Sequence, residues 1–164
     1  MSKVILKLGD DISTDAIYPG RFMATVLPSE TPQYAFADYT EFNTKAKNKE
    51  FASGSFIVAD NNFGCGSSRE QAASTLKGYE FGIIAKNFAR IFLQNSINLG
   101  LNCIVCPDIE ASEGDEIEIE DDMVHNKTTK KKFKIIPLPQ ARQAIVDAGG
   151  LIAYTRKRLL ETVK

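Results

Sequence analysis

Three short apolar runs constrain the fold of this chain more than any other feature. They occupy residues 55–59, 82–85 and 101–105, and each has the length and apolar character of a buried strand. The two stretches between them, at about residues 68–80 and 87–98, place apolar side chains at helical spacing. Strands that alternate with helices need right-handed crossover connections. The chain is therefore expected to be an α/β protein with an at least partly parallel sheet.

The remaining segments extend this core on both sides. A first strand is expected at about residues 3–8, followed by a long loop and one short amphipathic helix within residues 28–50. In the last third, apolar and charged residues alternate with period two at 115–119 and again at 132–136, which predicts an antiparallel β-ribbon. Two helical segments then close the chain. The length of 164 residues and the lack of an internal repeat favour a single domain, residues 1–164.

Composition and charge exclude several classes of protein. With 43% hydrophobic and 25% charged residues the chain has the balance of a soluble globular protein, and its net charge of −1 leaves no broad cationic surface for nucleic acid. No stretch reaches the roughly 18 apolar residues of a membrane span, and the apolar start is too short for a signal peptide. Three cysteines do not form the framework of a secreted domain. A cytoplasmic protein with reduced thiols is expected.

The segment from Gly64 to Glu70, GCGSSRE, combines glycines, two hydroxyls and a fixed cation at the predicted start of a helix. Each feature suits an anion: glycines let the backbone approach, Ser67 or Ser68 can cap the helix, and the first helical N–H groups lack internal partners. Arg69 adds a forked donor for a carboxylate. The same cationic surroundings would stabilise a serine alkoxide. A purely structural turn with a capping serine fits the same residues, and spacing alone leaves both interpretations open.

Five blocks spread along the chain resemble the small subunit of 3-isopropylmalate dehydratase and its homoaconitase relatives. They occur in the order of that family. The blocks are GDDISTDAIYPGRF at 9–22, NFGCGSSREQA at 62–72, IAKNFARIF at 84–92, NSINLGL at 95–101 and AGGLIAY at 148–154.

This resemblance implies a fold, a partner and a reaction. The fold would be the swivelling β/β/α domain of the aconitase type, a mixed sheet with crossover helices plus a C-terminal β-ribbon. The domain would close over a large subunit that carries a 4Fe-4S cluster, and together they would dehydrate and hydrate a 2-hydroxy dicarboxylic acid. No cofactor is expected on this chain itself.

The resemblance also assigns roles to individual residues. Ser67, as an alkoxide, would be the base that takes the proton beside a carboxylate. The substrate carboxylate would be held by Ser68, Arg69 and the backbone at Gly66. Two further family positions, Thr14 as a binding residue and Asp15 as a catalytic one, would support them; an Asx-turn or helix cap is the alternative for Asp15. These residues are Ser67, Ser68, Arg69, Gly66, Thr14 and Asp15.

The loop at Met23 and Ala24 bears on the choice of substrate. In homoaconitase-like relatives an arginine reads the distal carboxylate at the position that Ala24 takes here, and Arg21 is out of register. A buried third carboxylate would lack its ion partner, so a diacid with an apolar substituent is expected. The leading hypothesis is 3-isopropylmalate, in leucine biosynthesis. The small subunit of 2,3-dimethylmalate dehydratase, or a non-enzymatic anion-binding module of the same fold, remains an alternative.

Three cysteines and one histidine suggest a metal site at first sight. Cys103 and Cys106 form a C-x-x-C, and Cys65 with His125 would complete four ligands. However, residues three apart on a strand point to opposite faces, and His125 is expected in an exposed turn of the ribbon. No metal is therefore expected on this chain.

Overall fold

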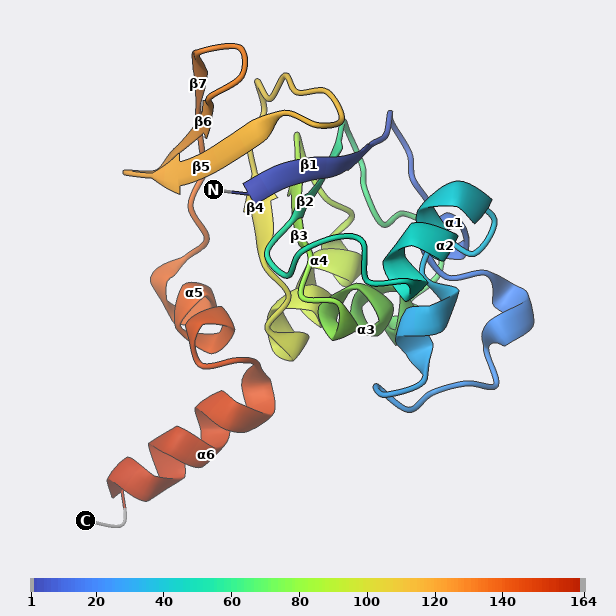
Figure 1. Ribbon diagram of the computed structural model, residues 1–164. Coiled ribbons are helices and arrows are strands. Elements are labelled where there is room, and N and C mark those ends of the chain that lie inside the picture. Colours follow the sequence, from blue (N-terminus) through green and yellow to red (C-terminus); the bar gives the residue numbers. More distant parts are fainter. Residues whose placement is uncertain (1, 163–164) are drawn as a thin grey trace.

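The computed structural model describes residues 2–162, and its centre is a sheet of four parallel strands (Figure 1). The strands lie in the order β4-β3-β2-β1. Since each right-handed crossover steps to the next neighbour in the same direction, the connecting helices cover one face. The expected parallel sheet is confirmed. Its strands are β1 (Ser2–Lys7), β2 (Phe56–Ala59), β3 (Gly82–Ala85) and β4 (Cys103–Val105).

Four helices and two 3₁₀ turns connect these strands. The long loop expected after the first strand is in fact partly helical, because Ser13 caps a short helix by accepting a hydrogen bond from the Ala16 N–H at 3.1 Å. The helices are α1 (Thr14–Ile17), α2 (Thr40–Lys47), α3 (Glu70–Gly78) and α4 (Arg90–Leu99), and the 3₁₀ turns are Gly20–Phe22 and Thr31–Tyr34.

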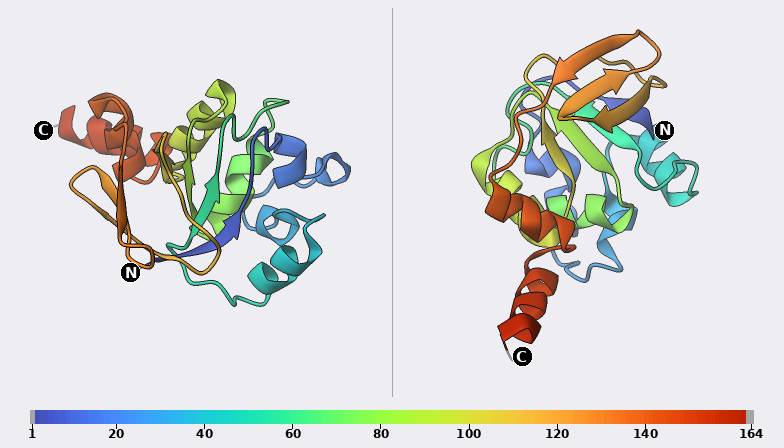
Figure 2. Two further views of the ribbon diagram at one scale, coloured as in Figure 1. Left: turned by 90° about the horizontal axis from the view of Figure 1, so that it is seen from above. Right: turned by 90° about the vertical axis from the view of Figure 1, so that its left-hand side faces the viewer.

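The predicted ribbon forms the rest of the sheet. Its strands β5 (Glu116–Glu120), β6 (Met123–Asn126) and β7 (Lys131–Lys134) are antiparallel, and β5 pairs with the start of β1. After β7 the chain returns to the opposite edge, where the Ile136 N–H donates to the Val105 carbonyl at 2.9 Å. The seven-stranded sheet is therefore curled, and the ribbon covers the face that the helices leave open (Figure 2).

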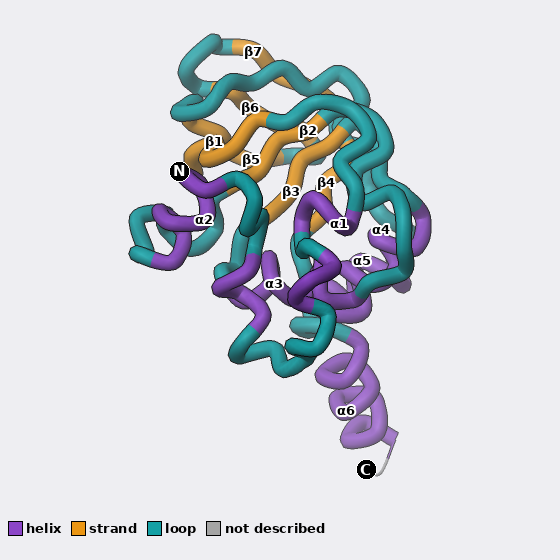
Figure 3. The backbone as a smooth tube through the Cα atoms, turned by 90° about the vertical axis from the view of Figure 1, so that its right-hand side faces the viewer, coloured by secondary structure: helices purple, strands orange, loops and turns teal. Residues whose placement is uncertain are grey.

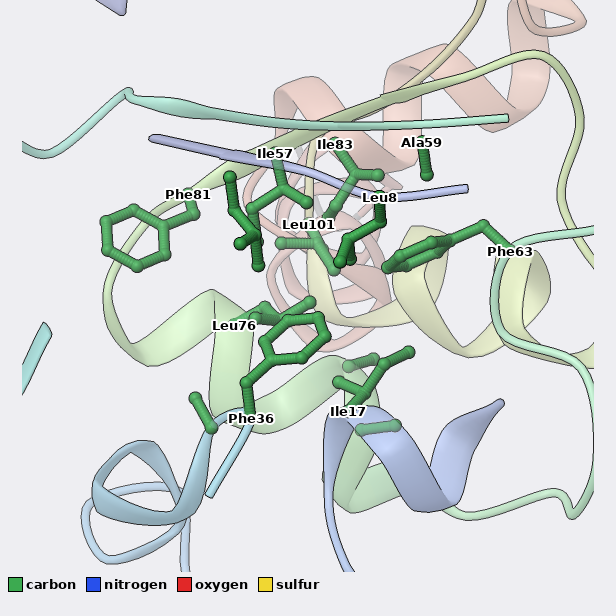
Figure 4. Packing of buried hydrophobic residues seen from close by; sticks show 14 of the residues in the cluster. Leu8, Ile17, Phe36, Ile57, Ala59, Phe63, Leu76, Phe81, Ile83 and Leu101 are labelled. Atoms are coloured by element: carbon green, nitrogen blue, oxygen red, sulfur yellow. The ribbon is translucent and has the colours of Figure 1, made fainter. Parts of the chain in front are cut away.

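The alternation of side chains in the central strands divides the core into two clusters. On β2, Ile57 and Ala59 pack with the helices, whereas Phe56 and Val58 pack toward the ribbon. All four are buried, which explains why this strand reads as a continuous apolar run. Figure 4 shows the cluster on the helix side, with Leu76 of α3 facing the strands.

Two helices close the described chain. They are the two closing helical segments that the sequence predicted, α5 (Gln140–Asp147) and α6 (Leu151–Thr162), and Gly149 and Gly150 lie between them. α5 packs on α4, while α6 has no buried residue and projects from the body (Figure 1). No helix within residues 2–162 has both the length and the apolar character needed to cross a membrane.

Candidate active site

The loops that follow β1 and β2 lie side by side at the carboxyl end of the parallel strands. The Thr14 N–H donates to the Cys65 carbonyl at 2.8 Å, and the Gly64 N–H donates to the Ile12 carbonyl at 2.7 Å. α1 lies on the side of the molecule where β1 ends, the side that faces the viewer in Figure 3. Neighbouring parallel strands end at the same edge, which is where open α/β sheets bind ligands. Two motifs about fifty residues apart are thereby joined.

Gly64 allows the motif to lie directly against α4. Its φ is +87°, and a Cβ at this position would lie 2.2 Å from Cγ of Phe92. Gly66 also has a positive φ of +101°, but a Cβ there would meet nothing closer than the Thr14 hydroxyl at 3.5 Å. The lack of space beside Phe92 thus makes glycine necessary at Gly64, whereas the positive φ favours glycine at Gly66.

Ser67 is an exposed residue whose hydroxyl is held by a buried partner. Its Oγ lies 3.1 Å from Oγ1 of Thr14, and the same threonine hydroxyl donates to the Ser67 carbonyl at 3.2 Å. Thr14 is 2% exposed, so its rotamer is fixed by packing. The pair presents one oriented hydroxyl to the outside of the protein, which is the arrangement that a base acting on a bound ligand requires.

Arg69 lies two residues after Ser67 and is held by two acceptors of α1 and its C-cap, Asp15 and Tyr18. Its Nη1 donates to Oδ1 of Asp15 and to the Tyr18 carbonyl, both at 2.9 Å. Nε is buried and has no hydrogen-bond partner among the described residues, so the guanidinium keeps unmet donor capacity. The side chain is 15% exposed. A cation fixed in this way suits a carboxylate ligand.

The Asp15 carboxylate is engaged in holding Arg69 in place. Its Oδ1 accepts from Arg69 and also from the Gly20 N–H at 2.8 Å. These two donors, the arginine first, lower the pKa of Asp15. Their geometry supports a positioning role for this residue.

Comparisons with known proteins identify the family. The family model described as the aconitase C-terminal domain matches residues 11–109. The 3-isopropylmalate dehydratase small subunit of Methanosarcina mazei is 42% identical over 159 residues, which cover 94% of this chain and 96% of that protein. This chain belongs to the aconitase C-terminal domain family. The resemblance inferred from the five sequence blocks is confirmed.

Further members of the family match nearly the whole chain. The isopropylmalate/citramalate isomerase small subunit of Methanocaldococcus jannaschii is 40% identical, covering 96% of this chain and 95% of that protein. The crystal structure of a 3-isopropylmalate dehydratase from the same organism superposes with a TM-score of 0.88 at 38% identity, covering 98% of this chain and 96% of the other. The predicted fold class, a mixed sheet with crossover helices and a C-terminal ribbon, is therefore confirmed.

One local prediction about the family motif is wrong. Neither Ser67 nor Ser68 caps α3: the helix begins at Glu70, its N-cap is Arg69, and no side chain caps it. The reason is that Ser67 engages Thr14 across the sheet edge and Ser68 lies exposed, with its carbonyl held by Nδ2 of Asn95 at 3.4 Å. Neither serine hydroxyl is used by the helix: that of Ser67 is bound to Thr14, and that of Ser68 has no hydrogen-bond partner among the described residues.

Met23 and Ala24 lie on an exposed loop directly after the first 3₁₀ turn. The Met23 side chain is 41% exposed, and its carbonyl accepts from Nε2 of Gln71 at 3.3 Å. The loop continues from Gly20, which is bound to Asp15. Met23 and Ala24 are therefore connected to Arg69 through the backbone of this turn, and the structure brings both family motifs into one region.

The three cysteines of this family member do not form a metal site. Cys103 and Cys106 belong to the clusters on opposite faces of the sheet, and burial raises the pKa of their thiols to about 12 and about 11. Across residues 2–162, no three His, Cys, Asp or Glu side chains form a group able to hold a metal ion. His125 lies half-buried on β6, opposite Glu118 and Lys132, so the expectation of an exposed turn is wrong.

Replacing Asp15 by asparagine is expected to lower kcat/KM of the assembled enzyme about tenfold, by the same factor at pH 6, 7 and 8. The lowered pKa means that the contribution of this carboxylate is complete above its unfolded pKa of about 3.9 and is lost only as pH falls through the still lower folded value. Asp38→Asn is the matched control, because it removes the exposed Arg21–Asp38 pair. A ratio of wild type to Asp15→Asn that changes between pH 6 and 8 would instead indicate proton transfer by Asp15.

Proposed function

We propose that this chain is the small subunit of a 3-isopropylmalate dehydratase, a hydro-lyase that acts only together with a large subunit. The observation that carries the proposal is the hydroxyl of exposed Ser67, held by buried Thr14, while the next residue of α1, Asp15, anchors the cation of Arg69. It occurs in a chain that matches small subunits of this enzyme along nearly its full length. The whole chain, residues 1–164, is proposed to work as one swivelling domain.

The residues of this chain would handle the proton and the carboxylate of the substrate. Dehydration of a 2-hydroxy diacid breaks a C–H bond beside a carboxylate and a C–OH bond on the neighbouring carbon, and a double bond forms between the two. Ser67 in its alkoxide form would take the proton, aimed by Thr14. Arg69 and the uncapped start of α3 would stabilise both the alkoxide and the negative charge that builds up on the carboxylate.

The 4Fe-4S cluster expected for this family is proposed to belong to the large subunit. The cysteines of this chain do not fit it, because Cys103 and Cys106 lie on opposite faces of the sheet with their thiols protonated. Such a cluster acts as a Lewis acid on a departing hydroxyl. The contribution of this chain is confined to the groups around Ser67. A cytoplasmic location, with no binding to nucleic acid or membrane, is part of the proposal.

The isolated chain is accordingly expected to be colourless, to hold no stoichiometric iron and to turn over no diacid. The physical reason is the separation of its cysteines, which gives a cluster no common set of ligands. Iron analysis and a visible absorption spectrum of the purified chain measure this directly. One cluster per chain after anaerobic reconstitution with iron and sulfide would refute the assignment of the cluster to the partner.

The substrate is proposed to carry an apolar substituent next to the reacting carbons. Met23 and Ala24 present apolar side chains on the exposed loop, and the position of Ala24 offers no cation for a third carboxylate. The reconstituted pair should therefore be assayed on 3-isopropylmalate, citramalate, 2,3-dimethylmalate and homoaconitate. Preference for 3-isopropylmalate is expected, and activity on homoaconitate alone would contradict the argument from the loop.

A further inference from the structure

Tyr18 contacts both the loop that carries Met23 and Ala24, through its hydroxyl, and the Arg69 guanidinium, through its backbone carbonyl. It follows α1 directly and is fully buried. Its ring makes edge contacts with Phe22, at 6.4 Å between centroids, and with Tyr34, at 6.0 Å. These contacts fix the orientation of the phenol ring and therefore the position of its hydroxyl.

The Tyr18 hydroxyl holds the loop that carries Met23 and Ala24. It donates to the Phe22 carbonyl at 3.0 Å and to the Thr25 carbonyl at 3.2 Å, so one proton is shared between the two ends of this loop. Burial raises the pKa of Tyr18, and the hydroxyl therefore stays a neutral donor over the ordinary assay range.

The same residue holds Arg69 through its backbone. The Tyr18 carbonyl accepts from Nη1 of Arg69 at 2.9 Å, beside the bond from that atom to Asp15. A substitution by phenylalanine would remove the hydroxyl and leave the ring and this carbonyl in place. The two functions of Tyr18 are therefore separable by experiment.

The loop depends on a small number of polar contacts. Besides the Tyr18 hydroxyl, Nε2 of Gln71 holds the Met23 carbonyl, so three of the four carbonyls of residues 22–25 are bound by side chains. Phe22 is also stacked on Tyr34, at 4.1 Å between centroids. Beyond Phe22 the side chains of Met23 and Ala24 are exposed and have no comparable packing. Loss of the Tyr18 hydroxyl should loosen this part of the loop first.

We propose that Tyr18 is a positioning residue for substrate selection, whose hydroxyl fixes the loop at Met23 and Ala24 relative to Arg69. The inference rests on the proposed function, because the loop matters only if it contacts the substituent of a bound diacid. A fixed loop preserves a surface complementary to a branched apolar group. A smaller substituent would depend on that surface much less.

The test is Tyr18→Phe in the reconstituted two-subunit complex, assayed on 3-isopropylmalate and on citramalate. We expect KM for 3-isopropylmalate to rise about five- to tenfold and kcat to change less than about twofold, because Arg69 keeps its carbonyl acceptor. The ratio of kcat/KM for the two substrates should fall by nearly the same factor. Tyr34→Phe is the matched control, since within residues 2–162 its hydroxyl makes no hydrogen bond, and it should leave the ratio unchanged.

The variant Gln71→Met and the activity of the wild-type complex distinguish a failure of the inference about Tyr18 from a failure of the proposed function. Gln71→Met removes the other side-chain donor to the loop and should shift the ratio in the same direction by about two- to threefold. If Tyr18→Phe does not fold, judged by its thermal transition, an unchanged ratio in Gln71→Met overturns the proposal. An equal loss of kcat on both substrates, with KM unchanged, also overturns it. A wild-type complex inactive on all diacids would refute the proposed function instead.

Discussion

Replacing Ser67 by alanine is expected to lower kcat of the reconstituted complex about a thousandfold, with KM changed less than about threefold. The hydroxyl removed belongs to an exposed serine and is the one that buried Thr14 orients. Steady-state assays on 3-isopropylmalate measure both constants. A loss confined to kcat follows from a role in proton transfer, because Ser68 and Arg69 remain to bind the carboxylate.

Ser68→Ala is the matched control for this substitution. Ser68 is the adjacent serine and is also exposed, but its hydroxyl has no hydrogen-bond partner among the described residues. Its loss should raise KM about threefold to tenfold and leave kcat within a few-fold. If Ser67→Ala retained every activity of the complex, the alternative of a non-enzymatic anion-binding module would be favoured over the enzyme.

Gly64→Ala is expected to have the largest effect on stability, about 3 kcal/mol or more of lost free energy of unfolding. A methyl group would lie 2.2 Å from Cγ and 2.4 Å from Cβ of Phe92, and φ at this position is +87°. A rotamer change cannot relieve a contact with Cβ, so α4 or the motif itself must move. For a chain of this size the midpoint of thermal unfolding should fall by about 10 °C.

Two other glycines make this prediction specific. At Gly9 a Cβ would meet nothing within 4 Å, so Gly9→Ala should shift the midpoint by less than about 2 °C. At Gly66 a Cβ has room but φ is +101°, and an intermediate loss of about 1 kcal/mol is expected. Thermal unfolding followed by circular dichroism gives all three values. Equal shifts for the alanine variants of Gly64 and Gly9 would show that the approach of α4 is not what requires glycine.

Much of the fold could be predicted because its signals are local. The three apolar runs became β2, β3 and β4, and the alternation at the end of the chain became the ribbon. The closure of the sheet could not be predicted, because a single hydrogen bond from Ile136 to Val105 leaves no pattern in the sequence. The helix at Thr14 was missed because four residues are too few to show a helical period.

The candidate site shows the same division between local and distant contacts. The sequence identified the motif around Ser67, but it assigned the serines to capping α3, since the competing partner Thr14 lies 53 positions away. Tyr18 and Asn95 were missed as supports of the site. An aromatic residue directly before Pro19-Gly20, in an otherwise polar loop, was the available signal for Tyr18. No local signal marked Asn95.

The most direct test of the central claim is to assay 3-isopropylmalate with this chain alone, with its large subunit alone and with the two combined. The formation of the unsaturated diacid can be followed by its ultraviolet absorbance. The account predicts turnover only in the mixture, reaching a maximum at one copy of each subunit. Full activity of the large subunit alone, or an inactive mixture whose large subunit contains an intact cluster, would contradict it.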